Sequence, residues 1–225
     1  MNSKVVGLGS QRGPLLQVAL DITDMRDALR VCRALPLRRV ILEVGTPLLK
    51  AHGISAIRAV KKESQGRMVI ADTKTLDAAE VEVSLAKKGG ADGATVSALA
   101  PRETVEIFGA TCKAKGLLCL VDLLGSSIDA RGLATLAKVA DVVICHGGID
   151  QGLDPETLGL KVLQLKNSFP GKLVAVAGGI TPETTEVLVR SGADIVIVGR
   201  HITGSRDPGA SALEMLRLLR GQEPL

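Results

Sequence analysis

Three ionisable side chains, Asp72, Lys74 and Asp77, directly follow a short apolar run. On an extended strand Asp72 and Lys74 point to the same side, because side chains alternate with a period of two. A carboxylate and an ammonium group would then meet at the edge of a core, an arrangement suited to catalysis. A strand that simply meets solvent in a charged turn explains the same residues. The cluster alone leaves both interpretations open.

The chain contains eight short apolar runs that could position such a cluster, each followed by a helical pattern. Near-continuous apolarity is typical of parallel strands covered on both faces. The repeated strand–helix unit predicts α/β architecture, a single (β/α)₈ TIM barrel over residues 16–225 after a flexible lead-in at 1–15. An open doubly wound sheet is the alternative. The runs are 16–20, 40–42, 68–71, 94–96, 117–121, 142–145, 173–177 and 195–198.

Start and stop residues predict helices between these runs. Asp24 can cap a helix over 25–35, which Pro36 ends. Glycines end several of the others, as they commonly do. The remaining predicted helices cover 76–88, 101–115, 182–191 and about 210–219.

A barrel would place its chemistry at the carboxyl ends of the strands. We interpret the charges at the strand beginnings, such as Arg67, Asp141 and Asp194, as mostly solvated. The strand ends differ because most carry side chains suited to catalysis or binding, and we interpret this clustering as functional. In order, the ends carry Asp21, Glu43, Asp72 with Lys74, Val96, Asp122, His146, Gly178-Gly179-Ile180 and Gly199-Arg200.

Glycines follow the last two runs, where barrels often bind phosphate. Gly178, Gly179 and Gly199 let backbone N–H groups approach an anion without obstruction by a Cβ atom. Arg200 can add a bidentate clamp. A tight turn alone is the alternative explanation of the glycine pair.

Glu43 and Asp72 are hard oxygen donors on neighbouring predicted strands, and two carboxylates with substrate oxygens suit Mg²⁺. A structural ion-pair network with Lys74 is the alternative. His146 ends the sixth run, where a neutral imidazole can take or return a proton. We interpret His52 as part of a helix cap and His201 as a rim residue.

Composition limits the function classes. The chain has 225 residues, a formal net charge of +4, four cysteines without C-x-x-C spacing, two Phe, and neither Trp nor Tyr. Buried reduced thiols are therefore expected rather than bridges or a zinc site. Few aromatic rings disfavour base stacking and hence a main role in nucleic-acid binding. The apolar runs are too short to cross a membrane, and we expect a cytoplasmic protein.

Six motifs, in order from Leu16 onward, resemble the orotidine 5′-monophosphate decarboxylase suprafamily. Asp-x-Lys-x-x-Asp marks the suprafamily, and Glu43 and His146 are similar to its magnesium-using branch. That branch includes 3-hexulose-6-phosphate synthases, which the segment 202–208 resembles, and 3-keto-L-gulonate-6-phosphate decarboxylases. The motifs are Leu-Gln-Val-Ala-Leu-Asp21, Leu-Glu43-Val-Gly-Thr-Pro, Ala-Asp72-Thr-Lys74-Thr-Leu-Asp77, His146-x-Gly-x-Asp150, Ala-Val-Ala-Gly178-Gly179-Ile and Val-Gly199-Arg200.

The resemblance implies a barrel enzyme that condenses formaldehyde with D-ribulose 5-phosphate to D-arabino-3-hexulose 6-phosphate, reversibly and with Mg²⁺. It implies that Glu43 and Asp72 hold the metal. We interpret His146 as the residue that moves the proton at C1. Lys74 and Asp21 would orient or stabilise the enediolate oxygens, since cationic and polar groups stabilise charge that develops in a reaction.

The resemblance also implies a phosphate site at Gly179, Gly199 and Arg200. The position of Asp77 crosses to the neighbouring subunit's site in the family, so a homodimer is implied. A decarboxylase or another phosphosugar lyase remains the alternative within the enzymes. A non-catalytic module that binds a phosphate ligand is the alternative of another class.

Overall fold

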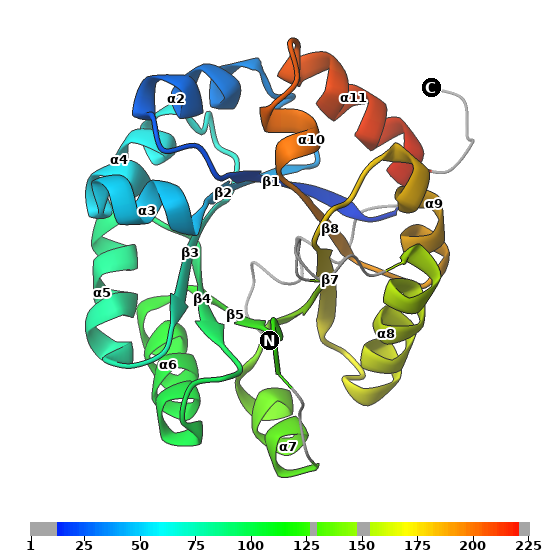
Figure 1. Cartoon of the computed structure of the whole chain (residues 1–225). Helices are drawn as coiled ribbons and strands as arrows, with labels where there is room; N and C mark the ends of the chain where they lie inside the picture. Colours follow the sequence, from blue (N-terminus) through cyan, green and yellow to red (C-terminus); the bar gives the residue numbers. More distant parts are fainter. Residues whose placement is uncertain (1–12, 127–129, 148–153, 221–225) are drawn as a thin grey trace.

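Eight parallel strands close into a barrel in the computed structural model, which describes residues 13–126, 130–147 and 154–220 (Figure 1). Each strand pairs with the next along the chain, and β1 also pairs with β8, with Leu16 opposite Val196. This closure confirms the barrel and excludes the open sheet. The strands are β1 Leu15–Leu20, β2 Val40–Val44, β3 Val69–Thr75, β4 Gly93–Ser97, β5 Leu118–Asp122, β6 Val142–His146, β7 Leu173–Ala177 and β8 Ile195–Val198.

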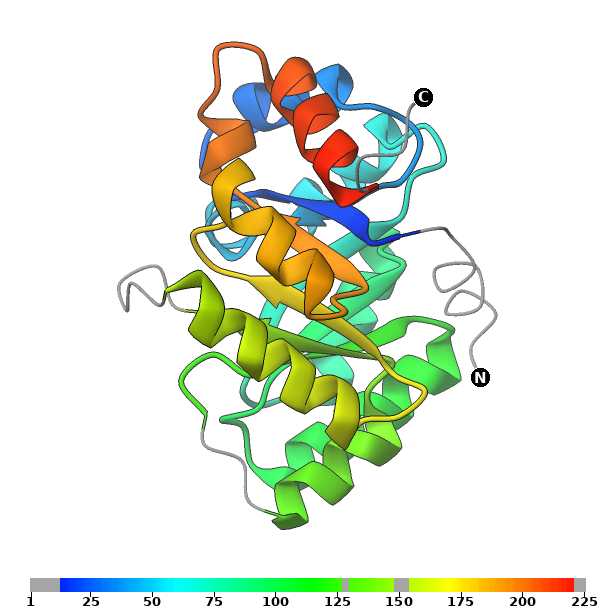
Figure 2. The same ribbon diagram turned by 90° about the vertical axis from the view of Figure 1, so that its right-hand side faces the viewer.

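Helices form an outer layer around the barrel (Figures 1 and 2). Within the described residues, no helix is long and apolar enough to span a membrane. The helices are α2 Met25–Ala34, α3 Thr46–His52, α4 Ile54–Glu63, α5 Ala79–Gly89, α6 Arg102–Lys115, α7 Ala130–Val139, α8 Pro155–Ser168, α9 Pro182–Arg190, α10 Arg200–Thr203 and α11 Pro208–Leu219.

All five predicted helices occur, with ends shifted by one to three residues. Asp24 caps α2 as expected, because its side chain accepts hydrogen bonds from Arg26 N and Asp27 N. Helix α5 begins at Ala79 instead of residue 76, since Ala78 has a φ of 52° and cannot continue a right-handed helix. Helix α11 begins at Pro208, two residues early, because Asp207 caps it.

Two apolar clusters pack against the strands, one outside the barrel and one inside it. The larger fills the space between the barrel and its helices and includes Leu16, Leu42 and Phe108. The smaller fills the barrel interior and includes Ile41 and Leu120. Alternate residues of each strand supply the two clusters, as in other filled barrels. The barrel is therefore a packed core rather than a pore, and an open space can exist only at its ends.

Aspartates at the amino-terminal end of the barrel each accept a hydrogen bond from the backbone of the preceding strand. The same geometry recurs before β4, β6 and β8. Asp141 and Asp194 are therefore structural rather than merely solvated, contrary to our expectation. The bonds are Val69 N to Asp92 at 2.9 Å, Cys119 N to Asp141 at 3.0 Å and Val174 N to Asp194 at 2.7 Å.

Arg67, which we also expected to be solvated, is almost completely buried. This side chain is 4% exposed and donates to the carbonyl oxygens of Ser64, Leu35, Cys32 and Glu63. A buried guanidinium needs such partners because each unmade hydrogen bond would cost free energy. Arg67 thus joins the ends of α2 and α4 to the start of β3. The four cysteines are buried and free, as predicted.

Candidate active site

A cavity of about 830 Å³ opens at the carboxyl ends of the strands. Ala19, Ile144, Ala177 and Ile197 of the inner apolar cluster line its floor. Every predicted site residue except Asp77 lines this cavity, which confirms that the strand ends converge. These residues are Asp21, Glu43, Asp72, Lys74, His146, Gly178, Gly179, Gly199 and Arg200.

Asp72 and Lys74 meet as predicted, but not through simple alternation along a strand. The β3–β4 pairing shifts register between Ala71 and Thr75, and Lys74 lies within the shift with a φ of 43°. Such bulges commonly redirect side chains next to active sites. The Lys74 ammonium lies 3.0 Å from Asp72 Oδ2 and 2.6 Å from Asp122 Oδ2. Burial lowers the Lys74 pKa, but the two carboxylates outweigh it and raise the pKa overall.

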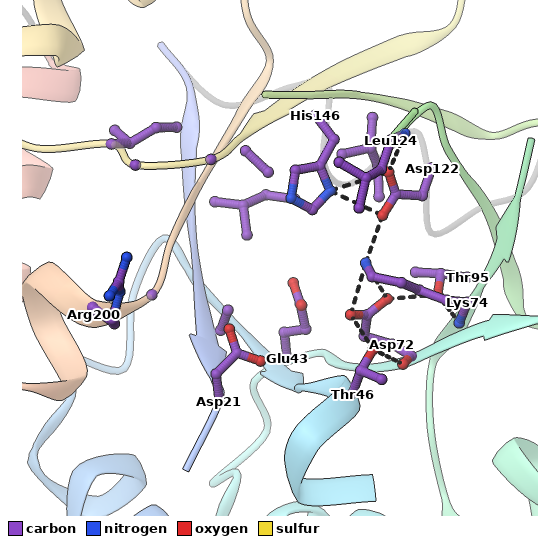
Figure 3. Close-up of a pocket in the computed structure, with 18 of the residues that line it drawn as sticks. Asp21, Glu43, Thr46, Asp72, Lys74, Thr95, Asp122, Leu124, His146 and Arg200 are labelled. Carbon is purple, nitrogen blue, oxygen red and sulfur yellow. Dashed lines mark hydrogen bonds and ion pairs between the residues drawn. The ribbon is translucent and has the colours of Figure 1, made fainter. Parts of the chain in front are cut away.

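Asp122 joins Lys74 to His146, a role that its sequence position alone did not reveal. The carboxylate is 2% exposed and accepts from Lys74 Nζ and, at 3.0 Å, from His146 Nδ1 (Figure 3). Burial acts to raise the Asp122 pKa, but His146 and Lys74 bring it down to about 2. In a neutral imidazole, a hydrogen bond from Nδ1–H to the Asp122 carboxylate leaves Nε2 as the acceptor nitrogen.

Glu43 and Asp21 add further carboxylates beside Asp72. Burial and the Asp72 charge raise the pKa of Glu43 to about 8, against the hydrogen bond that Gln17 donates to it. The same two causes raise the pKa of Asp21, which Lys74 and His146 partly oppose. Lys74 already pairs with Asp72 and Asp122, so this side of the cavity holds more acidic groups than its lysine can balance.

The donor chemistry of this region fits Mg²⁺. Among the residues that the structure describes, no cluster of three or more His, Cys, Asp or Glu side chains forms a metal site. Mg²⁺ nevertheless keeps several waters and is commonly held by one or two carboxylates plus substrate oxygens. Glu43 and Asp72 supply that number of carboxylates, and a cation would offset the charge that raises the Glu43 pKa. Mg²⁺ binding by this pair stays a prediction.

Glu43→Gln is expected to change how stability depends on pH in metal-free protein. The Glu43 pKa is about 8 in the folded chain against 4.5 when unperturbed. The folded state therefore keeps a proton that the unfolded state releases, so its stability contribution falls as pH rises through this interval. Gln cannot ionise and removes the fall. Urea unfolding of variant and wild type with EDTA, between about pH 5 and pH 8, measures the difference. Equal pH slopes would contradict the raised pKa.

The glycine-rich loops lie across the cavity from the lysine cluster, as the position of Arg200 in Figure 3 shows. Gly178 has a φ of 107°, and a Cβ atom there would overlap with Gly147 O. Gly179 also has a positive φ, with open space beside it. Backbone N–H groups of such loops can hold an anion. The arrangement agrees with a phosphate site opposite Lys74, which stays a prediction.

Asp77 is the one predicted site residue that the structure places elsewhere. Its side chain is exposed, and Asp77 Oδ1 accepts a hydrogen bond from Ala78 N at 2.7 Å. Asp150 lies outside the described residues. His52 is the last residue of α3, and its Nε2 lies 2.8 Å from Thr23 O. His201 lines the rim of the cavity, as expected.

The fold and the cavity place this chain among the (β/α)₈ barrels that carry an ionisable site at the carboxyl ends of their strands. The chain belongs to the orotidine 5'-phosphate decarboxylase / HUMPS family, whose model matches residues 14–215. The family resemblance of the motifs is thereby confirmed.

Relatives and solved structures give the same family assignment. A bifunctional enzyme Fae/Hps of Methanothrix thermoacetophila is 38% identical over 212 residues, which cover 93% of this chain and 54% of that protein. The chain thus spans about half the length of the curated relatives it matches. A crystal structure of 3-hexulose-6-phosphate synthase is 33% identical, with a TM-score of 0.84, and the alignment covers 91% of this chain and 99% of that one. The Salmonella typhimurium synthase is 30% identical, with a TM-score of 0.84 and coverages of 93% and 100%.

Proposed function

We propose that this chain is a 3-hexulose-6-phosphate synthase, which condenses formaldehyde with D-ribulose 5-phosphate to D-arabino-3-hexulose 6-phosphate. One observation carries the proposal: the Lys74–Asp122–His146 network and the Glu43–Asp72 pair face one cavity whose far side holds the glycine loops and Arg200. A proton-moving group, an oxyanion-stabilising group and a phosphate cradle are what this reaction requires. Its similarity to the synthase structures supports the same reaction.

His146 is the proposed base. Nε2 removes a proton from C1 of the sugar, and the electron pair left on C1 delocalises into the C2 carbonyl to give an enediolate. C1 then attacks the formaldehyde carbon, whose oxygen takes the proton back from His146. Atoms and charge balance over the sequence. Asp122 holds the imidazole by Nδ1 and stabilises its charged form after each proton transfer, as a carboxylate does for a histidine base.

Lys74 is the proposed donor to the sugar oxygens on which negative charge develops. The ammonium group is held by two carboxylates and remains charged, so it is arranged before the reaction begins. Asp21, directly after β1, orients the sugar hydroxyls in this proposal. Glu43 and Asp72 would hold Mg²⁺, which when bound supplies further stabilisation of negative charge on adjacent oxygens.

The glycine loops and Arg200 hold the phosphate in this proposal. The phosphate does not react, so its binding energy serves to position C1 beside His146. Backbone N–H groups near Gly179 and Gly199 would surround the anion, and the guanidinium of Arg200 would pair with it.

Gly45→Ala is expected to lower kcat by about 10-fold to 100-fold through Asp21, because small misplacements in a site are costly. Gly45 has an ordinary φ of −65°, so alanine can adopt its backbone conformation. An added Cβ atom would nevertheless overlap with Asp21 Oδ1 and displace that carboxylate. Steady-state kinetics with a parallel urea titration separate the effect from unfolding. Unchanged kcat would contradict the assigned position of Asp21.

We also propose a homodimer in which Asp77 completes the neighbouring subunit's site. Asp77 is exposed and lies between Leu76, 54% exposed, and Val81, 59% exposed; Leu99, on the next loop of the barrel, is also 59% exposed. Exposed apolar side chains of this size favour contact with another protein surface. An isologous dimer would bring both copies of Asp77 into equivalent positions.

Mixing two inactive variants is expected to restore activity if the sites are shared. Lys74→Met and Asp77→Asn subunits form hybrid dimers with one intact site, so random exchange should recover about a quarter of the wild-type activity. The assay follows formaldehyde consumption after refolding the variants together. Lys74→Met mixed with His146→Gln is the control, since both residues belong to one subunit's cavity. Equal recovery in both mixtures, or none with Asp77→Asn, would refute the shared site.

The proposed reaction is tested by formaldehyde consumption with D-ribulose 5-phosphate, with and without Mg²⁺. We expect turnover with Mg²⁺ and its loss with EDTA. Protein that binds the sugar phosphate without turnover would refute the synthase and support a non-catalytic module. A parallel assay on 3-keto-L-gulonate 6-phosphate tests the decarboxylase, and faster turnover there would also refute the synthase.

A further inference from the structure

Thr95 is a buried polar residue of β4, between Ala94 and Val96. The side chain is 1% exposed and lies at the edge of the cavity. Its hydroxyl donates to Asp72 Oδ1 at 2.8 Å and accepts from the backbone N–H of Lys74, also at 2.8 Å. One hydroxyl thus touches a proposed metal ligand and holds the backbone of the proposed oxyanion donor.

The register shift explains why Lys74 needs this partner. The β3–β4 ladder passes from Ala71 opposite Ala94 to Thr75 opposite Val96, so four steps along β3 match two along β4. The intervening N–H of Lys74 donates to the Thr95 side chain. Thr73 adds a second hydrogen bond between β3 and β4, because its hydroxyl donates to Thr95 O at 2.6 Å.

The conformation of Lys74 would not persist without such contacts. A lysine with a φ of 43° occupies the left-handed region, which costs a non-glycine residue free energy unless its surroundings hold it there. This conformation directs the ammonium group towards Asp72 and Asp122. The hydroxyl that holds the backbone therefore also sets where the charge lies.

We propose that Thr95 is a positioning residue of the reaction, fixing the Asp72 carboxylate and the Lys74 ammonium relative to each other. The expected effect on kcat rests on the proposed function. The positions of Asp72 and Lys74 relative to Thr95 do not depend on it. Thr46, the first residue of α3, also contacts Asp72, but its hydroxyl lies 2.8 Å from both Oδ2 and the main-chain oxygen of that one residue. The Thr95 hydroxyl, by contrast, contacts both Asp72 and the backbone of Lys74.

Two pairs of variants isolate the hydroxyl. Thr95→Val keeps the shape of threonine and removes both hydrogen bonds, whereas Thr95→Ser keeps the hydroxyl and removes a methyl group. Thr95→Ala and Thr95→Ser form a second pair that differs by the hydroxyl alone. Thr111→Val is the control, because the Thr111 hydroxyl donates to the backbone carbonyl of Ile107 within α6, and neither residue lines the cavity.

In the full-length chain with Mg²⁺, Thr95→Val is expected to lower kcat by about 10-fold to 100-fold, as loss of a residue that orients a metal ligand does. The KM for D-ribulose 5-phosphate should stay within about threefold, because the phosphate is held across the cavity. Mn²⁺ binding, followed by electron paramagnetic resonance without substrate, should weaken by about 10-fold. Thr95→Ser should recover most of both losses, and Thr111→Val should lose neither.

A merely structural hydroxyl would give a different pattern. Thr95→Val would then lower the free energy of unfolding while leaving kcat and Mn²⁺ affinity unchanged, and that result would overturn the proposal. If Thr95→Val does not fold, the comparison of Thr95→Ala with Thr95→Ser decides in the same way. Inactive wild type would refute the proposed function instead, and Mn²⁺ binding would still test Thr95.

Discussion

Lys74→Met is expected to lower kcat for formaldehyde condensation by about 10³-fold, the effect of removing one preorganised charge-stabilising donor. The variant also leaves Asp72 and Asp122, 5% and 2% exposed, without the cation that they share. A buried charge that loses its partner costs about 3–5 kcal/mol of stability. Initial rates with saturating sugar phosphate measure the kinetic loss, and urea unfolding measures the loss of stability.

Lys166→Met is the matched control for this variant. Lys166 pairs with Asp194 at 2.8 Å, at the opposite end of the barrel. We expect the control to lose some stability and keep its kcat. If the two variants lose activity in proportion to their loss of folded protein, Lys74 has no role in the chemistry.

His146→Gln is expected to lower kcat by about 10²-fold to 10⁴-fold, the usual contribution of a general acid–base group. Gln can still contact Asp122 and fill the cavity wall, but it cannot take a proton. Exchange of the C1 proton of D-ribulose 5-phosphate with deuterium, followed by NMR without formaldehyde, should slow by a similar factor. Binding of the sugar phosphate should persist, because the phosphate is held elsewhere.

His52→Gln is the control here, since His52 lies in α3 against Thr23 O and outside the cavity lining. It should exchange the C1 proton at the wild-type rate. Unchanged exchange in His146→Gln would remove this histidine from the proton transfer, whatever its effect on overall turnover.

The strand ends were predictable because a parallel barrel obeys a simple geometric rule. Glu43 and His146 lie 103 positions apart in the sequence, yet both end a strand and therefore line the same cavity. Periodicity and glycine positions were sufficient to find those ends. Helix starts were less accurate, since Ala78 adopts a backbone conformation that its residue type does not indicate.

The relations between site residues could not be predicted in the same way. Asp122 was placed at the correct end of β5, but its role depends on distances to side chains from β3 and β6. The bulge at Lys74 depends on a hydroxyl from β4, which no local pattern along β3 encodes. Arg67 was misjudged as solvated for a related reason, because its partners come from α2 and α4 as well as its own loop.

The recurring aspartates at the amino-terminal end of the barrel affect how the sequence of this protein can evolve. They fasten three pairs of neighbouring strands at the end remote from the cavity, so these pairings are held by side chains that do not line the mouth. Substitutions in the cavity can therefore change which substrate binds, while the hydrogen bonds at the opposite end of the barrel are kept. Within a family that includes decarboxylases, this separation lets one scaffold acquire different chemistries without first losing its structure.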